Sequence, residues 1–390
     1  MPTAATYAQT ATQRVHMGRP AAEAVAEEAG QTGAQRVFLM ASRSLRENTD
    51  EIERIQQALG ERFAGLYDGM PPHGPRGAVL EAAALAREAG ADLLVSVGGG
   101  SITDATKVLA VCLTHGIREH ADFDAYRMQV DASGQISMPE FSPPEVPVVC
   151  VPTTLSGGEF NPLSGVTDER EKLKQGYTQR DMVPVAVVLD PAITVHTPQW
   201  LWLSTGVRAV DHAMETLGSF LSNPFCDDMA SCALRNLQEG LQRVHARPDD
   251  LDARLSCQIG AWQSMLPIVA GIPMGISHAT GHALGGTFDV PHGHTSCVMA
   301  PFALAFNQSV NGERQQRISA ALGKPDEPAS KLADELIRNL GMPRSLTEVG
   351  ITEADLPKLA DAVMHDIWAR TNPRDIEHAD QAREFLRTAL

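Results

Sequence analysis

Four histidines in the second half of the chain stand at spacings that allow joint chemistry. His278 and His282 are four residues apart, which places both on one face of a helix, and His292 follows after a turn that contains glycine, aspartate and proline. His212 lies in a separate helical stretch, GVRAVDHAMETLGS. Imidazoles bind metal ions and also hold or deliver protons. We therefore expect these four residues to converge, either on a metal ion or on a reacting carbonyl group.

A glycine-rich segment earlier in the chain has the features of a phosphate site. Residues 95–107, VSVGGGSITDATK, read as an apolar strand, three glycines and then a helix that Ser101 opens. Glycines let a ligand approach the backbone, and the free N–H groups at a helix N-terminus attract phosphate. The segment fits the pyrophosphate of a dinucleotide, although its spacing differs from the G-x-G-x-x-G of a standard Rossmann domain. A purely architectural turn is the alternative.

Two further segments carry polar donors suited to the same ligand. Residues 152–159, PTTLSGGE, follow an apolar run with hydroxyl groups and glycines, and residues 166–174, VTDEREKLK, end on a lysine. Hydroxyl and ammonium groups both donate hydrogen bonds to phosphate or sugar oxygens. Taken singly, each segment is as easily a polar turn or a solvated hairpin.

The elements that position these residues divide the chain into two parts. Apolar runs at 36–41, 91–97, 146–151 and 185–189 alternate with helical patterns, which is typical of an α/β fold with a parallel sheet. After Pro191 the pattern is helical over 198–221, 227–244 and 251–270. We predict an α/β dinucleotide-binding domain over residues 1–194 and an all-α domain over 195–390. The polar, proline-rich stretch 119–145 is expected to be a surface insertion.

Composition and charge exclude several classes of protein. The 390 residues are 43% hydrophobic and 21% charged, with no run of eighteen apolar residues, so neither a disordered chain nor a membrane span is expected. The formal net charge of -16 disfavours nucleic acid as a partner. The N-terminus lacks the pattern of a secretory signal, which favours a cytoplasmic protein. The six cysteines show no C-x-x-C spacing and are expected to be reduced.

The motifs together resemble one family. GGGSITDATK, PTTLSGGE, GVTDEREKLK, GVRAVDHAMETLGS and GISHATGHALGGTFDVPHG, in this order, resemble the iron-containing alcohol dehydrogenases, most closely the branch that includes the maleylacetate reductases. The similarity runs from about residue 16 to the C-terminus. It implies the dehydroquinate synthase-like fold, an α/β domain followed by an all-α domain, with NAD(P)(H) held in a cleft between them. It also implies a homodimer.

The resemblance assigns roles to individual residues. The pyrophosphate would be held by Gly98, Gly99, Gly100 and Ser101, and the rest of the cofactor site would include Asp104, Thr153, Thr154 and Lys174. The positions of three metal-binding histidines correspond to His212, His278 and His292. His282 corresponds to a histidine near the nicotinamide and the substrate.

Ser42 stands where the family has an aspartate that holds the cofactor ribose. Nothing acidic there would repel a 2′-phosphate, and the neighbouring Arg43 can pair with one. We therefore predict that NADPH is accepted at least as well as NADH. A solvent-directed Arg43, with Ser42 merely capping the next helix, is the alternative.

One departure from the family bears on the metal. The metal-dependent members carry an aspartate four residues before the first histidine, and that position is Arg208 here. Asp211 is adjacent to His212, so on a helix it points about 100° away and does not replace the aspartate cleanly. A guanidinium repels a divalent cation by roughly 1 kcal/mol or more at contact distance even in a high dielectric. The resemblance to maleylacetate reductases, which also lack that aspartate, likewise favours catalysis without iron or zinc.

These observations predict an NAD(P)H-dependent carbonyl reductase or alcohol dehydrogenase acting on a small, carboxylated substrate, with maleylacetate the best single candidate. Arg208, His212, His278 and His292 would supply positive charge to the reacting oxygen, and His282 would deliver a proton. The nearest alternative is a dehydrogenase that binds iron or zinc through the three histidines. Two other classes remain open: a nucleotide-binding protein without turnover, and a lyase that uses NAD transiently.

Overall fold

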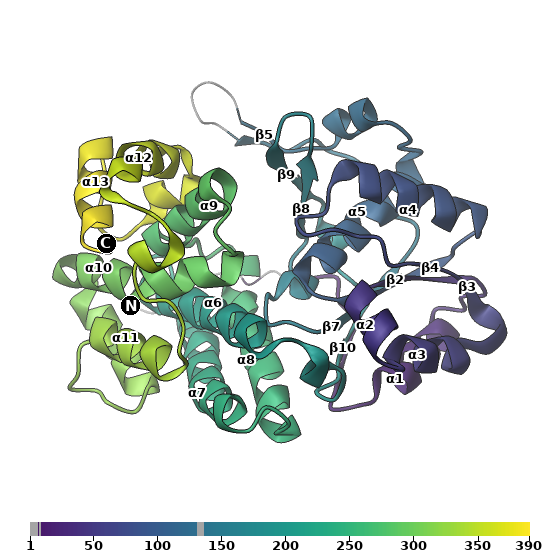
Figure 1. Cartoon of the computed structure of the whole chain (residues 1–390), viewed down its shortest axis with the longest axis horizontal. Coiled ribbons are helices and arrows are strands. Elements are labelled where there is room, and N and C mark those ends of the chain that lie inside the picture. The colour runs from purple at the N-terminus through teal and green to yellow at the C-terminus, as the bar shows by residue number, and fades with distance from the viewer. Residues whose placement is uncertain (1–6, 8, 131–135) are drawn as a thin grey trace. The chain divides into compact units, whose positions relative to one another are not determined.

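The computed structural model describes residues 7, 9–130 and 136–390, and the chain divides into two compact units (Figure 1). The sheet unit comprises Gln9–Thr197, and the helical unit comprises Pro198–Leu390 together with Tyr7. The division falls between Thr197 and Pro198, close to the expected domain boundary after residue 194, which stays a prediction.

A parallel six-stranded sheet forms the centre of the sheet unit. Its strand order is β1-β10-β7-β4-β2-β3, and every pairing is parallel. The bounds are β1 Arg14–Met17, β2 Val37–Ala41, β3 Phe63–Tyr67, β4 Leu93–Gly98, β7 Val148–Pro152 and β10 Ala186–Leu189. All residues of β2, β4, β7 and β10 are buried, as expected for strands covered on both faces. The predicted α/β class is confirmed.

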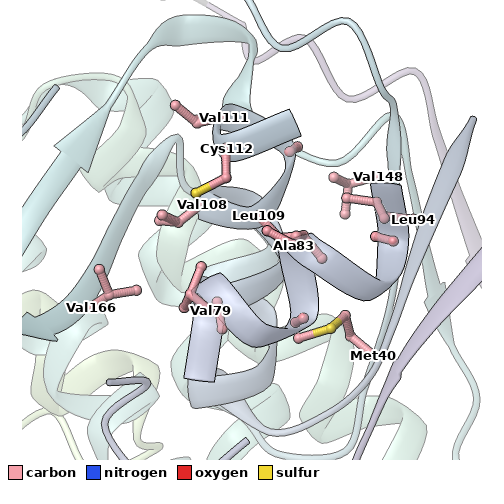
Figure 2. Close-up of a cluster of buried hydrophobic side chains, with 14 of the residues drawn as sticks. Met40, Val79, Ala83, Leu94, Val108, Leu109, Val111, Cys112, Val148 and Val166 are labelled. Carbon is pink, nitrogen blue, oxygen red and sulfur yellow. The ribbon is translucent and has the colours of Figure 1, made fainter. Parts of the chain in front are cut away.

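Helices cover the two faces of the sheet. They are α1 Ala21–Gln31, α2 Arg43–Asn48, α3 Glu51–Leu59, α4 Arg76–Glu88 and α5 Gly100–His115. Successive strand residues point to opposite faces, so Met40 packs with α4 and α5 whereas Leu39 packs with α1 and α3. Figure 2 shows Val79 and Ala83 of α4 beside side chains of α5 and the sheet. Each buried side chain of valine or leucine size contributes about 1.5–3 kcal/mol through loss of water contact.

Two short antiparallel pairs project from the sheet unit. The hairpin of β8 Leu163–Asp168 and β9 Leu173–Thr178 carries Lys174, which lies opposite Thr167. The second pair is β5 Gln129–Val130 and β6 Ile136–Ser137. It lies in the predicted insertion 119–145, of which residues 131–135 fall outside the described residues. The insertion thus contains a small antiparallel pair.

Helices make up the described structure of the helical unit. They are α6 Gln199–Gly218, α7 Pro224–Ala246, α8 Leu251–Val269, α9 Ile276–Phe288, α10 His292–Ala321, α11 Ala329–Asn339, α12 Leu356–His365 and α13 Ala379–Arg387. Between residues 198 and 390 there is no strand, so the predicted all-α character is confirmed. Helix α6 packs against α7, α8 and α10, and α9 packs against α10 and α12. Over the described residues, no helix combines the length and apolar character needed to cross a membrane.

Candidate active site

Three helices of the helical unit bring the predicted histidines together as two stacked pairs. The rings of His212 on α6 and His278 on α9 stack with centroids 4.8 Å apart and planes inclined by 27°. The rings of His282 on α9 and His292 at the start of α10 stack with centroids 5.9 Å apart and planes inclined by 10°. Residues four apart on one helix lie side by side, so Arg208 accompanies His212 along α6.

The carboxylate of Glu215 fixes the orientation of His278. Glu215 Oε2 lies 2.7 Å from His278 Nδ1, and the same carboxylate accepts hydrogen bonds from the backbone N–H groups of Gly275 and Ser277 at 2.8 and 2.9 Å. Because Nδ1 donates its hydrogen to Glu215, the other ring nitrogen, Nε2, carries a lone pair. Nε2 is buried and has no partner among the described residues, so it is available to a ligand.

Asp211 faces the same ring from the same side as Glu215. Its Oδ2 accepts a hydrogen bond from Ser277 Oγ at 2.7 Å and lies 3.4 Å from His278 Nδ1. Burial raises the pKa of both carboxyl groups, and the negative charge of Glu215 raises that of Asp211 further. Asp211 therefore borders the site, but it contacts the nitrogen that Glu215 already occupies and not Nε2.

Arg208 is the buried cation of this site, and its side chain has few partners. The residue is 8% exposed, and Nη1 donates one hydrogen bond, to Ser296 Oγ on α10, at 3.5 Å. Burial lowers the pKa of Arg208 to about 10, against the opposing pull of Asp211 and Glu215, so the group stays charged at neutral pH. Burial, followed by the charge of Arg208, lowers the pKa of His278 well below its usual value. The pKa of His212 is lowered in the same direction, chiefly by burial. Both rings are therefore neutral.

We call Arg208, Asp211, His212, Glu215 and His278 the Arg208 cluster. His282 lies beside it and is more open to solvent, with 39% of its side chain exposed against 3% for His278. Its Nδ1 lies 2.9 Å from Asp366 Oδ2. A carboxylate at Nδ1 fixes the orientation of the ring and leaves Nε2 as the ring nitrogen that can face a ligand.

The donor set does not fit a divalent cation. Ligand atoms of Asp211, Glu215 and His278 lie within 4.8 Å of one another, whereas those of His212, His278 and His292 are not grouped so closely in the described part of the chain. The oxygens of the first group already accept hydrogen bonds from N–H and O–H donors that point at them. The guanidinium of Arg208 adds a positive charge beside both His212 and His278. A cation would be repelled by that charge and would have to displace those donors.

The predicted phosphate-binding residues lie at the carboxyl ends of neighbouring strands. Strand β4 ends at Gly98, β7 ends at Pro152 beside it, and Thr153 N donates to Gly98 O at 3.0 Å. Helix α5 begins two residues after β4. Gly98 adopts φ 159°, and a Cβ there would lie 2.8 Å from the Ile102 side chain. The structure thus brings Gly98–Ser101 close to Thr153 and Thr154, where open α/β sheets bind ligands.

The other predicted cofactor residues lie near the same edge of the sheet. Asp104 Oδ2 is 3.7 Å from Lys174 Nζ and accepts a hydrogen bond from Gly165 N at 3.3 Å. Ser42 follows β2, and its backbone N donates to Val97 O on β4 at 2.9 Å. The Ser42 hydroxyl makes no capping hydrogen bond to α2 and pairs with the Ser44 hydroxyl at 2.9 Å.

Three residues of the histidine site, Glu215, Ser296 and Asp366, were not predicted from the sequence. Glu215 stands four residues after Asp211 on α6, a spacing that could have revealed it. Ser296 and Asp366 carry no local signal, because they reach the site only through the packing of α10 and the segment after α12.

Comparison with known proteins identifies the family. Residues 12–191 match the description "Iron-containing alcohol dehydrogenase", and residues 202–390 match "Fe-containing alcohol dehydrogenase family, C-terminal". The chain belongs to the iron-containing alcohol dehydrogenase family. The predicted resemblance is therefore confirmed over both parts of the chain.

Individual relatives agree with this assignment. Maleylacetate reductase 1 of Cupriavidus pinatubonensis is 30% identical, over 93% of this chain and 91% of that protein. A solved structure described as a putative alcohol dehydrogenase from Ralstonia eutropha JMP134 is 32% identical, with a TM-score of 0.84, and covers 99% of this chain and 98% of its own. Maleylacetate reductase from Agrobacterium tumefaciens is 26% identical, with a TM-score of 0.82, over 100% and 98%. The chain is an NAD(P)-dependent oxidoreductase that acts on a small molecule.

Proposed function

We propose that this enzyme reduces a small, carboxylated carbonyl compound with NAD(P)H and without a metal, maleylacetate being the best single candidate. The observation that carries the metal-independent part is the buried guanidinium of Arg208 beside two neutral imidazoles. The substrate class rests on the relatives named as maleylacetate reductases, which are about 30% identical over most of both chains.

The reaction places negative charge on the carbonyl oxygen of the substrate. The bound reduced nicotinamide supplies a hydride. If the hydride adds to the carbonyl carbon the product is an alkoxide, and if it adds to a conjugated carbon the product is an enolate. In both cases the charge collects on the same oxygen. A fixed cation with free donors in a buried site stabilises such an oxyanion, which is the role we assign to Arg208.

A proton completes the two-electron reduction, and we assign its delivery to His282. With Asp366 holding Nδ1, the protonated ring can release the proton on Nε2 to the alkoxide or to the carbanionic carbon of the enolate. The partial exposure of His282 allows it to recover a proton from solvent. His212 and His278 would offer neutral nitrogens to the substrate, and His292 would line the site beside His282.

For the cofactor we propose a site formed by Gly98–Ser101, Asp104, Thr153, Thr154 and Lys174. The free N–H groups at the start of α5 would hold the pyrophosphate, and the hydroxyl and ammonium groups would hold the remaining oxygens. Ser42 would admit the 2′-phosphate of NADPH. A homodimer, a cytoplasmic location and the lack of a nucleic-acid partner stay predictions.

Metal analysis together with an activity assay tests the proposal. We expect protein purified without added metal to contain much less than one equivalent of iron or zinc, and to reduce maleylacetate with NADPH equally well with and without a chelator. One tightly bound equivalent whose removal abolishes activity would instead support a metal-dependent alcohol dehydrogenase. The variant Arg208→Asp, which restores the family residue, should bind Zn²⁺ more tightly than the wild type, as measured by calorimetry.

A further inference from the structure

Lys107 on α5 is a fully buried lysine to which the proposed mechanism assigns no role. Its relative exposure is 0%, and its ammonium group donates three hydrogen bonds, to the backbone carbonyls of Gly158, Asn161 and Leu163, each 2.8 Å long. An ammonium group has three N–H donors, so all of them are used. Gly158 and Asn161 lie in the short segment that links Thr154 to strand β8, and Leu163 is the first residue of β8.

Burying a charge is costly unless its partners replace the lost water, so this arrangement needs a compensating gain. Burial lowers the pKa of Lys107, and the nearby carboxylate of Asp104 opposes that shift. The lysine also lies near Glu159, whose carboxyl group is buried within the same segment. An apolar residue would fill the space beneath the segment but could not donate to three carbonyls.

The segment and its neighbours carry several groups of the proposed cofactor site. Asp104, three residues before Lys107, lies 3.7 Å from Lys107 Nζ through Oδ1 and 3.7 Å from Lys174 Nζ through Oδ2. Its Oδ2 also accepts the hydrogen bond from Gly165 N in β8. Lys107 therefore joins helix α5 both to the segment that follows Thr154 and, through Asp104, to the β8–β9 hairpin.

We propose that Lys107 is a positioning residue of the cofactor site. Its ammonium group holds residues 153–163 and the β8–β9 hairpin against α5, in the arrangement that presents Thr154, Asp104 and Lys174 to the dinucleotide. Lys107 does not touch the cofactor. The inference rests on the proposed location of the cofactor site, and its test separates the two ideas.

Four variants of the full-length enzyme form the test. Lys107→Met keeps the length of the side chain and removes the donors, whereas Lys107→Arg keeps the charge with a planar group that cannot match three converging carbonyls. Leu109→Ala is the control for lost stability. Leu109 is on α5, as Lys107 is, but its side chain lies in the apolar cluster that α5 forms with α4 (Figure 2). Ser101→Asp probes the site itself, since a carboxylate at a helix N-terminus suits the helix but repels phosphate.

The measurements are the dissociation constant for NADPH by fluorescence titration, KM and kcat, the melting temperature, and hydrogen exchange. We expect Lys107→Met to weaken NADPH binding about 10- to 100-fold, because small displacements of positioned groups are costly, with kcat at saturating NADPH within about threefold of the wild type. Amides of residues 158–165 should exchange faster while those of β4 stay protected. Lys107→Arg should recover part of the affinity, and Leu109→Ala should lower the melting temperature without changing NADPH binding.

Three results would overturn the inference. The first is unchanged NADPH affinity in Lys107→Met when Ser101→Asp has lost it, which would leave the cofactor site in place and Lys107 without this role. The second is an equal loss of affinity in Leu109→Ala at a matched melting temperature. The third is unchanged affinity in both Ser101→Asp and Lys107→Met, which would remove the proposed cofactor site as well. If Lys107→Met does not fold, Lys107→Arg decides, and wild-type affinity and exchange in that variant would likewise contradict the inference.

Discussion

Each unit contains a buried arginine that acts on buried carboxyl groups, Arg76 in the sheet unit and Arg208 in the helical unit, and these two arginines have very different surroundings. Arg76 of the sheet unit is 0% exposed and donates to Asp168 Oδ2 at 2.9 Å, Asp124 Oδ1 at 3.0 Å and Tyr177 Oη at 3.0 Å. It also donates to the His120 carbonyl and to the Gln175 side chain. We call these side chains, with Arg76, the Arg76 network. Its donors are satisfied, so its charge serves to tie α4 to the β8–β9 hairpin and the insertion.

Arg208 of the helical unit has one hydrogen bond among the described residues, at 3.5 Å to Ser296. Its nearest carboxyl groups, Asp211 and Glu215, are occupied with Ser277, Gly275 and the ring of His278. A buried charge with few partners is costly and tends to be retained where it binds a ligand or stabilises a charge that forms during a reaction. The comparison suggests that the number of partners separates a charge that maintains the fold from a charge held ready for a ligand.

Removing the charge of Arg208 should have the largest effect on activity. We expect Arg208→Met to lower kcat/KM for the carbonyl substrate by about 10³-fold, the effect of losing a main oxyanion donor, because nothing else in the cluster is positively charged at neutral pH. The melting temperature should stay the same or rise, since a costly buried charge is replaced by an apolar group. Steady-state kinetics and calorimetry measure both.

Arg208→Lys is the matched control and should keep part of the activity because it keeps the charge. A wild-type kcat/KM in Arg208→Met, or a large fall in its melting temperature, would show that Arg208 stabilises the fold as Arg76 does. Either result would contradict the difference that we draw between the two arginines.

Removing Arg76 should have the opposite result. We expect Arg76→Met to lower the free energy of unfolding by about 3–5 kcal/mol, because it leaves the buried carboxylate of Asp168 without its buried partner. The folded fraction should retain nearly wild-type kcat. Arg170→Met is the control: Arg170 pairs with the same carboxylate at 2.7 Å, but its side chain is 51% exposed. Its removal should cost at most about 1 kcal/mol, as measured by urea unfolding.

The Arg76 network also predicts a pH dependence. Hydrogen bonds from Arg170, together with the charge of Arg76, hold the pKa of Asp168 well below its usual range. A lowered pKa in the folded state contributes stability above the pKa of the unfolded chain, about 4, and this contribution is lost as the pH falls further. Urea unfolding of the wild type should therefore show stability falling below about pH 4. Asp168→Asn should weaken that dependence, and an unchanged slope would contradict the assignment.

His282 should give the next largest effect. We expect His282→Ala to lower kcat by about 100-fold, since it removes the group assigned to proton delivery, while NADPH affinity stays nearly unchanged. His294→Ala and His196→Ala are controls that should keep wild-type kcat. Asp366→Asn should lower kcat by a smaller factor, because the ring remains but loses its orientation. Near-normal kcat of His282→Ala across the pH range would remove His282 from the mechanism.

The smallest predicted effect concerns the choice of cofactor. We expect the wild type to use NADPH at least as well as NADH, and Ser42→Asp to shift kcat/KM toward NADH by about tenfold, or 1.4 kcal/mol, because a carboxylate repels the 2′-phosphate. The Ser42 hydroxyl does not cap α2 and pairs only with the neighbouring Ser44 hydroxyl among the described residues, so both hydroxyls could turn to a ligand together. A wild-type preference for NADH above about tenfold would refute the assignment.

The sheet illustrates what the sequence reveals about the fold. Strands β2, β4, β7 and β10 are runs of apolar residues because both faces are covered, and that pattern is visible without any structure. Strands β1 and β3 lie at the two edges of the sheet, where most of their residues are only partly buried. The sequence of β1, RVHM, alternates polar and apolar residues, and the apolar residues of β3, FAGLY, are interrupted by Gly65. Edge strands depend on pairing partners that local composition does not reveal.

The site shows the same limit. His278 and His282 can be found from their spacing because they lie on one helix, and the glycine-rich loop can be found because it is one continuous turn. Asp366 meets His282 across 84 residues, and Lys107 meets the carbonyl of Leu163 across 56. Backbone carbonyls carry no sequence signature at all, so the three acceptors of Lys107 could only be found in the structure. Such contacts depend on how distant elements pack together, and the local patterns of a single sequence do not reveal that packing.

Strand β1 has partners at two very different distances along the chain, which bears on how the enzyme is made. Arg14 and His16 bind the buried carboxylate of Glu28 on α1, only 14 and 12 residues away. The sheet partner of β1 is β10, and the nearby Ala21 N reaches the Asp190 carboxylate across 169 residues. Contacts that close short loops form early, and an N-terminus emerges first from the ribosome. Strand β1 can thus contact helix α1 before β10 has been translated. The pairing of β1 with β10, which adds the N-terminal strand to the sheet, then forms only after most of the sheet unit has been synthesised.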